Sequence, residues 1–210
     1  MSALAMSADI RVQDQLRQFE TLLLRWNAKF NLIGRGEINA VRERHIDDAL
    51  HLAPLLVGPR VVDVGTGAGL PGLVLAIARA EFEFLLLERS ARKCAFLNRA
   101  VAELRLSNVS VLCVDFTAPA TQAPCNTLVA RAVAPPDTLW AQASHWLVHD
   151  GIALFPCGPN TRDRLPPGVD AGWHGTENGR GILCLRGGPN APEVESRADV
   201  AAIPPRDREG

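Results

Sequence analysis

The sequence predicts an α/β fold: a doubly wound, mostly parallel sheet of the Rossmann-like type that follows an N-terminal helical extension. From Arg60 onward, short β-branched or apolar runs alternate with helical patterns. Strands separated by helices form a parallel sheet with helices on both faces. A glycine-rich turn follows the first of these runs, at 65–69, and such turns lie where doubly wound sheets bind ligands.

Residues 1–58 are expected to form the helical extension, packed on the sheet domain. One apolar stripe predicts an amphipathic helix over 9–30, because its members recur at spacings of three and four: Val12, Leu16, Phe19, Leu23, Trp26 and Phe30. A polar turn at 34–36 separates it from a second helical segment, 37–56, which includes Ile38. We expect that helix to end just before Pro54.

The sheet domain is expected to span 59–187. Its predicted strands are 60–64, 82–87, 109–113, 127–130 and 152–155, its helices 70–80, 91–104 and 137–148, and a closing antiparallel hairpin uses 172–174 and 181–185. Residues 188–210 carry prolines and charges but little apolar content, which predicts a disordered tail.

Composition narrows the class of protein. With 22 basic and 23 acidic residues the net charge is −1, so any contact with RNA needs a local basic patch. The sequence shows no signal peptide and no apolar run long enough for a membrane span, which favours a cytoplasmic protein, expected to be a monomer. Five cysteines without a CxxC pair argue against a disulfide framework or a metal site, and the apolar neighbours of Cys94, Cys113 and Cys184 suggest packed thiols.

The glycine-rich turn suits a nucleotide-like cofactor, and two classes compete for it. The run from Gly67 to Gly72 matches the dinucleotide pattern GxGxxG, a weak signal by itself. Asp63 followed by Gly65, Gly67 and Gly69 is typical of methyltransferases that use S-adenosylmethionine. Glu88 fits both classes as a ribose contact. Length favours the methyl donor, because nicotinamide enzymes usually carry a separate substrate domain.

The segment 26–132 resembles a known family, the bacterial small-subunit ribosomal RNA methyltransferase G, also called glucose-inhibited division protein B. The residues that carry the resemblance are Trp26-Asn27, Phe30-Asn31-Leu32, Arg44-His45 with Asp48, Asp63 to Leu70-Pro71-Gly72, Leu86-Leu87-Glu88 and Arg131-Ala132. The resemblance implies a class I methyltransferase fold, S-adenosylmethionine as cofactor, and methylation of N7 of one guanine in the 530 loop of 16S ribosomal RNA.

The resemblance also implies site residues. Cofactor contacts carried over from the family are Gly65, Leu70, Phe116, Thr117 and Arg131, to which the general architecture adds Glu88 and Asp115. Asp63 is expected to organise the turn by accepting backbone N–H bonds. The chain departs from the family at Phe116 and Thr117, where alanine and glutamate are usual, at Cys157, where a lysine is common, and after Arg180, where Gly181 replaces a histidine.

Guanine N7 carries a lone pair, so its methylation needs alignment rather than a base that removes a proton. The sequence at 130–133, where a strand ends, is consistent with N7 as the target, because it lacks the Asn/Asp-Pro-Pro-aromatic sequence of methyltransferases that act on exocyclic amino groups. We expect Asp48 and Asn31 to stabilise the purine as it becomes cationic. His45, flanked by Arg44 and Asp48, is a third catalytic candidate, although a lone histidine is more often a core residue.

Basic residues from three segments are expected to bind RNA phosphate near the glycine-rich turn: Arg35, Arg42, Arg44, Arg89, Arg92, Lys93 and, near the last strand, Arg180. The competing interpretation is that the residues at 89–93 only solvate a helix start. Two other functions stay open at this point, a nicotinamide-dependent oxidoreductase and a non-catalytic RNA-binding or ribosome-assembly protein with the same fold.

Overall fold

Seven strands form one sheet in the computed structural model, which describes residues 3–118, 124–158, 165–175 and 181–187. The strands are β1 (Arg60–Val64), β2 (Glu83–Leu87), β3 (Val109–Leu112), β4 (Cys125–Val129), β5 (Leu147–Cys157), β6 (Asp170–Gly175) and β7 (Gly181–Arg186). Their order is β3-β2-β1-β4-β5-β7-β6. Strands β1 to β5 pair in parallel, and β7 is antiparallel to β5 and β6. The predicted parallel sheet and closing hairpin are confirmed.

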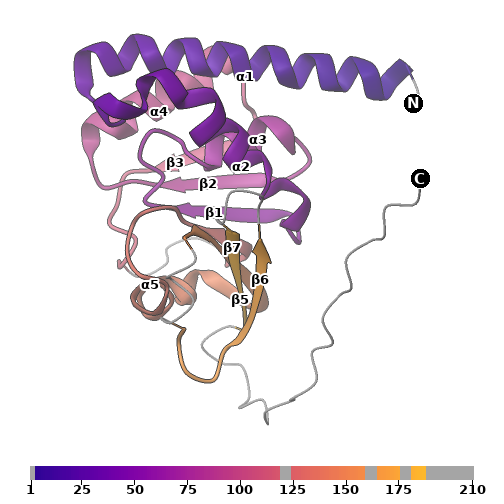
Figure 1. Ribbon diagram of the computed structural model, residues 1–210, viewed down its shortest axis with the longest axis vertical. Helices are drawn as coiled ribbons and strands as arrows, with labels where there is room; N and C mark the ends of the chain where they lie inside the picture. Colours follow the sequence, from indigo (N-terminus) through magenta and orange to yellow (C-terminus); the bar gives the residue numbers. More distant parts are fainter. Residues whose placement is uncertain (1–2, 119–123, 159–164, 176–180, 188–210) are drawn as a thin grey trace.

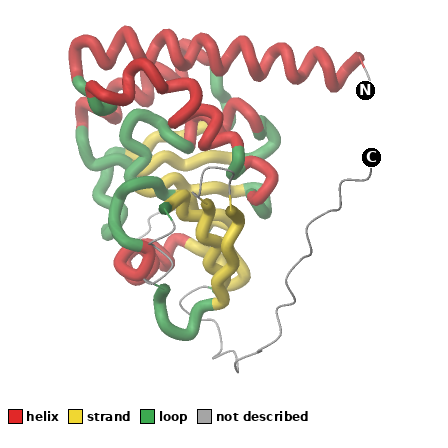
Figure 2. Tube along the Cα trace, viewed as in Figure 1, coloured by secondary structure: helices red, strands yellow, loops and turns green. Residues whose placement is uncertain are grey.

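Helices cover both faces of the sheet (Figures 1 and 2). They are α1 (Ala3–Phe30), α2 (Asp48–Leu50), α3 (Gly72–Ala78), α4 (Ala91–Leu104) and α5 (Pro136–Ala143). Buried residues of α1, α3 and α4 form one hydrophobic cluster, and those of α5 form a second. Neighbouring residues of β1 alternate between them, since Val61 belongs to the first cluster and Val62 to the second. The doubly wound architecture is therefore confirmed.

Helix α1 lies across α3 and α4, along the outer side of the first cluster (Figure 1). Leu16, Phe19 and Leu23 of the predicted stripe are fully buried. The Trp26 ring packs against Phe96 of α4, with 5.6 Å between ring centroids. The predicted amphipathic helix is confirmed, and it shares a hydrophobic core with the sheet domain.

The segment predicted as a second helix, 37–56, is irregular, and this prediction was wrong in detail. It contains a 3-10 helix at Arg35–Ala40, a π-helical turn at Arg42–Asp47, the short helix α2 and a 3-10 turn at Ala53–Leu55. Ile38, an apolar residue of the predicted second helix, is 37% exposed. The polar His45 is buried together with the apolar Val41 and Ile46, and π-helical turns frequently occur at functional sites.

The last helix is shorter than predicted. Helix α5 ends at Ala143 and β5 already begins at Leu147, whereas the pattern predicts a helix as far as 148. Trp146 between them is buried, and its indole N–H donates to the carbonyl of Phe116 at 3.0 Å. A contact with a distant segment thus ends the helix. The tail predicted at 188–210 lies outside the described residues, and within the described ones no helix is long and apolar enough to cross a membrane.

Truncation of Leu23 to alanine should destabilise the protein by about 2–5 kcal/mol, because it leaves a cavity where α1 meets the core. The control Ile10→Ala shortens an apolar side chain of the same helix that is 58% exposed, and its effect should stay within about 0.5 kcal/mol. Urea unfolding followed by circular dichroism measures both. Equal effects would show that α1 does not dock as described.

Candidate active site

One buried carboxylate organises the turn between β1 and α3. The Oδ2 atom of Asp63 accepts a hydrogen bond from the Thr66 hydroxyl at 2.6 Å and from the Gly72 backbone N–H at 2.7 Å. A Cβ atom at Gly72 would lie 2.6 Å from that oxygen, so only glycine lets α3 begin this close to β1. Asp63 therefore joins the strand end to the helix start, as expected for an acceptor of backbone N–H bonds.

The second oxygen of Asp63 is unusual. Burial raises the pKa of this carboxyl to about 7, although the bonds from Thr66 and Gly72 and the charge of Arg131 act in the opposite direction. The Oδ1 atom is buried and has no hydrogen-bond partner among the described residues. A buried acceptor without a partner is unfavourable. Asp63 itself is fully buried and is not among the residues that line the adjacent cavity, so its charge acts from behind the turn.

The three glycines of the turn have a left-handed backbone, and the middle one borders open space. Gly65, Gly67 and Gly69 have φ of +64°, +61° and +81°, a left-handed conformation that favours glycine. A Cβ at Gly67 would meet only the Gly65 carbonyl oxygen and the Lys93 ammonium, both at 3.8 Å. A ligand can therefore approach the backbone here at close range.

A cavity of about 560 Å³ separates the glycine-rich turn from the irregular segment at 32–52. One wall is the turn itself, with Leu70 and Lys93, and the opposite wall carries Arg44, His45 and Asp48. The end of β5 and the start of β7 close the far side with Pro156, Cys157, Gly158, Gly181 and Ile182. The glycine-rich turn and the predicted catalytic segment thus border the same cavity. Cys157 and Gly181, two positions where the chain departs from the family pattern, border it as well.

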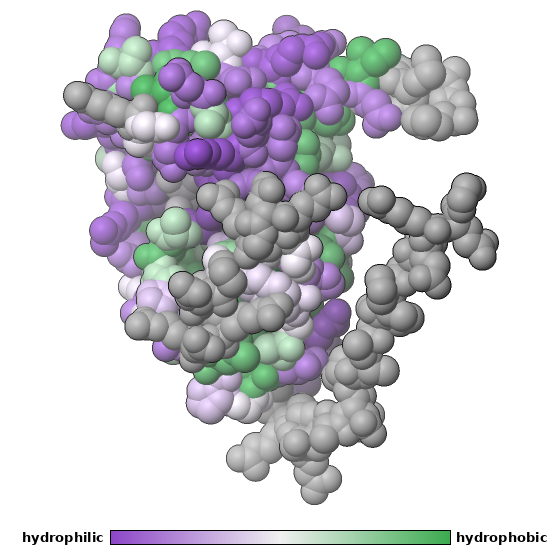
Figure 3. All heavy atoms as spheres, viewed as in Figure 1, coloured by the Kyte–Doolittle hydropathy of each residue, from purple (hydrophilic) through white to green (hydrophobic). Residues whose placement is uncertain are grey.

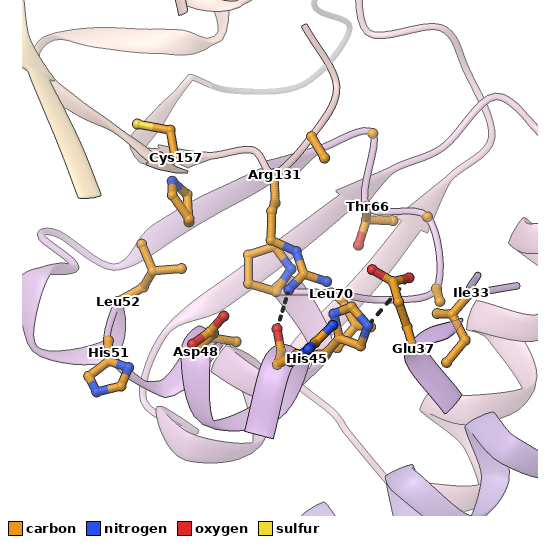
Figure 4. A pocket seen from close by; sticks show the side chains of 18 of the residues that line it. Ile33, Glu37, His45, Asp48, His51, Leu52, Thr66, Leu70, Arg131 and Cys157 are labelled. Carbon is orange, nitrogen blue, oxygen red and sulfur yellow. Dashed lines mark hydrogen bonds and ion pairs between the residues drawn. The ribbon is translucent and has the colours of Figure 1, made fainter. Parts of the chain in front are cut away.

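Charged side chains from three segments meet in this cavity (Figure 4). Arg131, which follows β4, extends toward Asp48 and His45 on the opposite wall, and its guanidinium donates to the Arg44 carbonyl at 3.3 Å. The buried His45 has its Nε2 atom 3.6 Å from a carboxylate oxygen of Glu37. Arg131 therefore bridges the sheet edge and the N-terminal segment.

Sequence reasoning missed Glu37. The same carboxylate oxygen that faces His45 accepts the Gly34 backbone N–H at 3.2 Å, so it fixes the turn that precedes the catalytic segment. Its position three residues after a turn glycine is a signal for such a capping contact. Glu37 borders the cavity and belongs among its acidic residues.

A second group of predicted cofactor residues lies beside the cavity rather than in its lining. The buried Glu88 carboxylate accepts the Gly67 N–H at 3.0 Å and the Ser90 N–H at 2.8 Å, and so connects the turn to the start of α4. Asp115 accepts both the backbone N–H and the hydroxyl of Thr117, at 3.0 and 2.8 Å, which lowers the pKa of Asp115. Phe116 is half-buried on the α5 side.

The remaining predicted residues are placed as follows. Asn31 is exposed at a φ of +48° and is not among the residues that line the cavity, so its position does not support contact with the reacting base. Arg42 pairs with Asp47 at 3.0 Å and Arg89 lies 3.7 Å from Asp115. Arg92 is exposed. The Arg35 side chain and all of Arg180 lie outside what the structure describes.

Comparison with known proteins decides the family. The family model described as rRNA small subunit methyltransferase G matches residues 12–165. The chain belongs to this family. Among its relatives, the ribosomal RNA small subunit methyltransferase G of Granulibacter bethesdensis is 41% identical over 77% of this chain and 75% of its own length. That of Acidothermus cellulolyticus is 47% identical over 81% and 77%.

Solved structures show the same fold. A ribosomal protein L11 methylase from Lactobacillus delbrueckii has a TM-score of 0.56 at 18% identity, over 69% of this chain and 79% of its own. A SAM-dependent methyltransferase from Aquifex aeolicus has a TM-score of 0.53 at 16% identity, over 70% and 92%. The fold is that of the class I methyltransferases, and the family membership makes this chain an S-adenosylmethionine-dependent enzyme. No group of three or more metal-binding side chains occurs among the described residues.

Affinity for S-adenosylhomocysteine, the demethylated donor, should depend on the charge of Asp63. Since the carboxyl has a pKa of about 7, raising the pH from 6 to 8 ionises it. The negative charge behind the glycine-rich turn should then strengthen binding of the ligand ammonium by up to roughly tenfold. In Asp63→Asn the amide oxygen can still accept both hydrogen bonds, so we expect a folded protein with weaker, pH-independent affinity.

Calorimetric titration across this pH range measures the effect. The control Asp150→Asn removes a carboxylate that is 97% exposed and should retain the wild-type profile. A wild-type affinity that does not change with pH would refute the assigned role of Asp63.

Proposed function

We propose that this protein transfers a methyl group from S-adenosylmethionine to N7 of a guanine in 16S ribosomal RNA. The main structural support is that the glycine-rich turn and the segment with His45 and Asp48 border one cavity. Membership in the ribosomal RNA small subunit methyltransferase G family supports the substrate. The donor and the base would then meet inside that cavity.

The residues present fit the methyl donor. The backbone of Gly65, Gly67 and Leu70, which borders the cavity, would hold its methionine part, and Gly67 leaves open space for it. Glu88 would accept a ribose hydroxyl beside its two backbone contacts. We place the adenine against the neighbouring segment 115–117. When bound, S-adenosylmethionine supplies an electrophilic methyl group on a positively charged sulfur.

Asp48 is proposed to stabilise the positive charge that guanine gains when N7 is methylated. Its side chain borders the cavity opposite the glycine-rich turn, where a carboxylate acts at short range in partly excluded solvent. His45, paired with Glu37, would position this segment. No proton has to leave N7, so the main contribution of the site is alignment of the two reactants, an effect worth up to about 7–11 kcal/mol in favourable cases.

RNA phosphate would be bound at the rim of the cavity. Arg44 and Lys93 line it from opposite walls and Arg92 is exposed nearby on α4. Hydrophilic side chains gather on the surface over the N-terminal helices (Figure 3). This rim would attract phosphate although the whole chain is close to neutral. We propose that the protein acts as a monomer in the cytoplasm, where its RNA substrate resides.

Two alternative functions can be tested against this one by ligand binding. A nicotinamide-dependent oxidoreductase would bind NADH in preference to S-adenosylhomocysteine, and a non-catalytic RNA-binding protein would bind neither. Membership in the methyltransferase family favours neither alternative. We expect calorimetry to detect S-adenosylhomocysteine and not NADH.

Deletion of the gene should remove one N7-methylguanine from 16S RNA, and the purified protein should restore it. Mass mapping of the RNA checks this result.

Asp48→Asn should lower the turnover rate by about tenfold to a hundredfold while S-adenosylhomocysteine affinity stays within about twofold, because the lost charge acts on the base. The control Asp47→Asn changes a neighbouring carboxylate that pairs with Arg42 outside the cavity lining. Full turnover in Asp48→Asn would overturn its role.

Lys93→Gln should weaken RNA binding and lower the slope of log affinity against log salt by about one, as expected for one lost phosphate contact. The control Arg99→Gln removes a charge that pairs with Glu103 further along α4 and should leave the slope unchanged. Filter binding at several salt concentrations measures both. Equal slopes in the wild type and Lys93→Gln would place the RNA elsewhere.

A further inference from the structure

Two cysteines lie next to each other outside the cavity. Cys94 is in the first turn of α4 and Cys113 follows β3 directly. Their sulfur atoms are 2.6 Å apart, closer than unbonded sulfurs normally approach and near the bonding distance of about 2.05 Å. The structure records both as free thiols, so this is a pair that a small movement can bond.

The two thiols differ in their access to solvent. Cys94 is buried, and its thiol donates to the Glu88 carbonyl at 3.2 Å. Burial raises the pKa of Cys94 to about 12, and the neighbouring Cys113 adds to this shift. Cys113 is exposed, which corrects the expectation of a packed thiol. A reagent from solvent therefore meets Cys113 first.

We propose that Cys94 and Cys113 form a reversible intramolecular disulfide by exchange with a small disulfide such as oxidised glutathione. The Cys113 thiolate attacks one glutathione sulfur, which forms a mixed disulfide and releases the first glutathione thiolate. The Cys94 sulfur, after losing its proton to solvent, then attacks the Cys113 sulfur and expels the second glutathione. The two thiols lose two electrons and two protons, and one oxidised glutathione becomes two reduced ones.

The disulfide would tie α4 to the end of β3 beside the proposed donor site. Cys94 contacts the backbone of Glu88, whose carboxylate holds Gly67, and Cys113 lies two residues before Asp115. The inference stands on thiol geometry alone and does not depend on the proposed function. Closing the loop between 94 and 113 should also restrict the unfolded chain and stabilise the fold.

The full-length folded protein is incubated in glutathione buffers of increasing oxidised fraction, quenched by acid, and mapped by mass spectrometry without reduction. We expect a peptide pair joined through Cys94 and Cys113 with the loss of two hydrogen atoms, and a melting temperature higher by about 5 °C that returns to its starting value with dithiothreitol. Cys184→Ser, which alters a buried cysteine on β7, should behave like the wild type.

Single variants test the order of the steps. Cys94→Ser should keep glutathione on Cys113, because the second thiol is missing, whereas Cys113→Ser should leave Cys94 reduced. Three results would overturn the proposal. They are wild-type protein that retains glutathione on Cys113 without a crosslink, thiols that stay reduced in the most oxidising buffer, and a disulfide that joins two chains.

Discussion

The hydrogen bonds accepted by the Asp63 carboxylate determine how β1 turns into α3, and the proposed donor site depends on that turn. One oxygen takes both the Thr66 hydroxyl and the Gly72 N–H, which leaves the other buried without a partner among the described residues. The same geometry demands glycine at 72, where a Cβ would collide with Asp63. The energetic cost of burying a carboxylate therefore lies directly behind the turn that borders the cavity.

The N-terminal extension supplies chemistry as well as packing. Helix α1 is anchored in the core by Leu16, Phe19 and Leu23, and this fixes the start of the irregular segment that carries His45 and Asp48. Arg131 donates to the Arg44 carbonyl, so the end of β4 and the extension hold each other across the cavity. A class I sheet alone would lack one wall of this site.

The local sequence pattern was sufficient to predict those helices, strands and turns whose tertiary contacts favour the same structure. The run at 91–104 predicts α4 with the bounds that the structure shows, and Asp63 with its glycines predicts the turn between β1 and α3. The local pattern failed where contacts with distant parts of the chain determine the structure. The buried Trp146, whose indole N–H donates to the Phe116 carbonyl, lies where α5 was expected to continue. The segment 37–56, expected to be a regular helix, is divided into short helical turns beside the cavity. Glu37 was missed because its role depends on His45, eight residues further along the chain.

The donor is proposed to bind between the glycine-rich turn and the segment with Asp48. A crystal structure of the protein with S-adenosylhomocysteine tests it most directly. We expect the methionine part of the ligand against the backbone of Gly65, Gly67 and Leu70, and the ligand sulfur facing the side of the cavity that carries Asp48 and Arg131. Ligand density elsewhere, or a cavity that stays closed by its own side chains at saturating ligand, would contradict it.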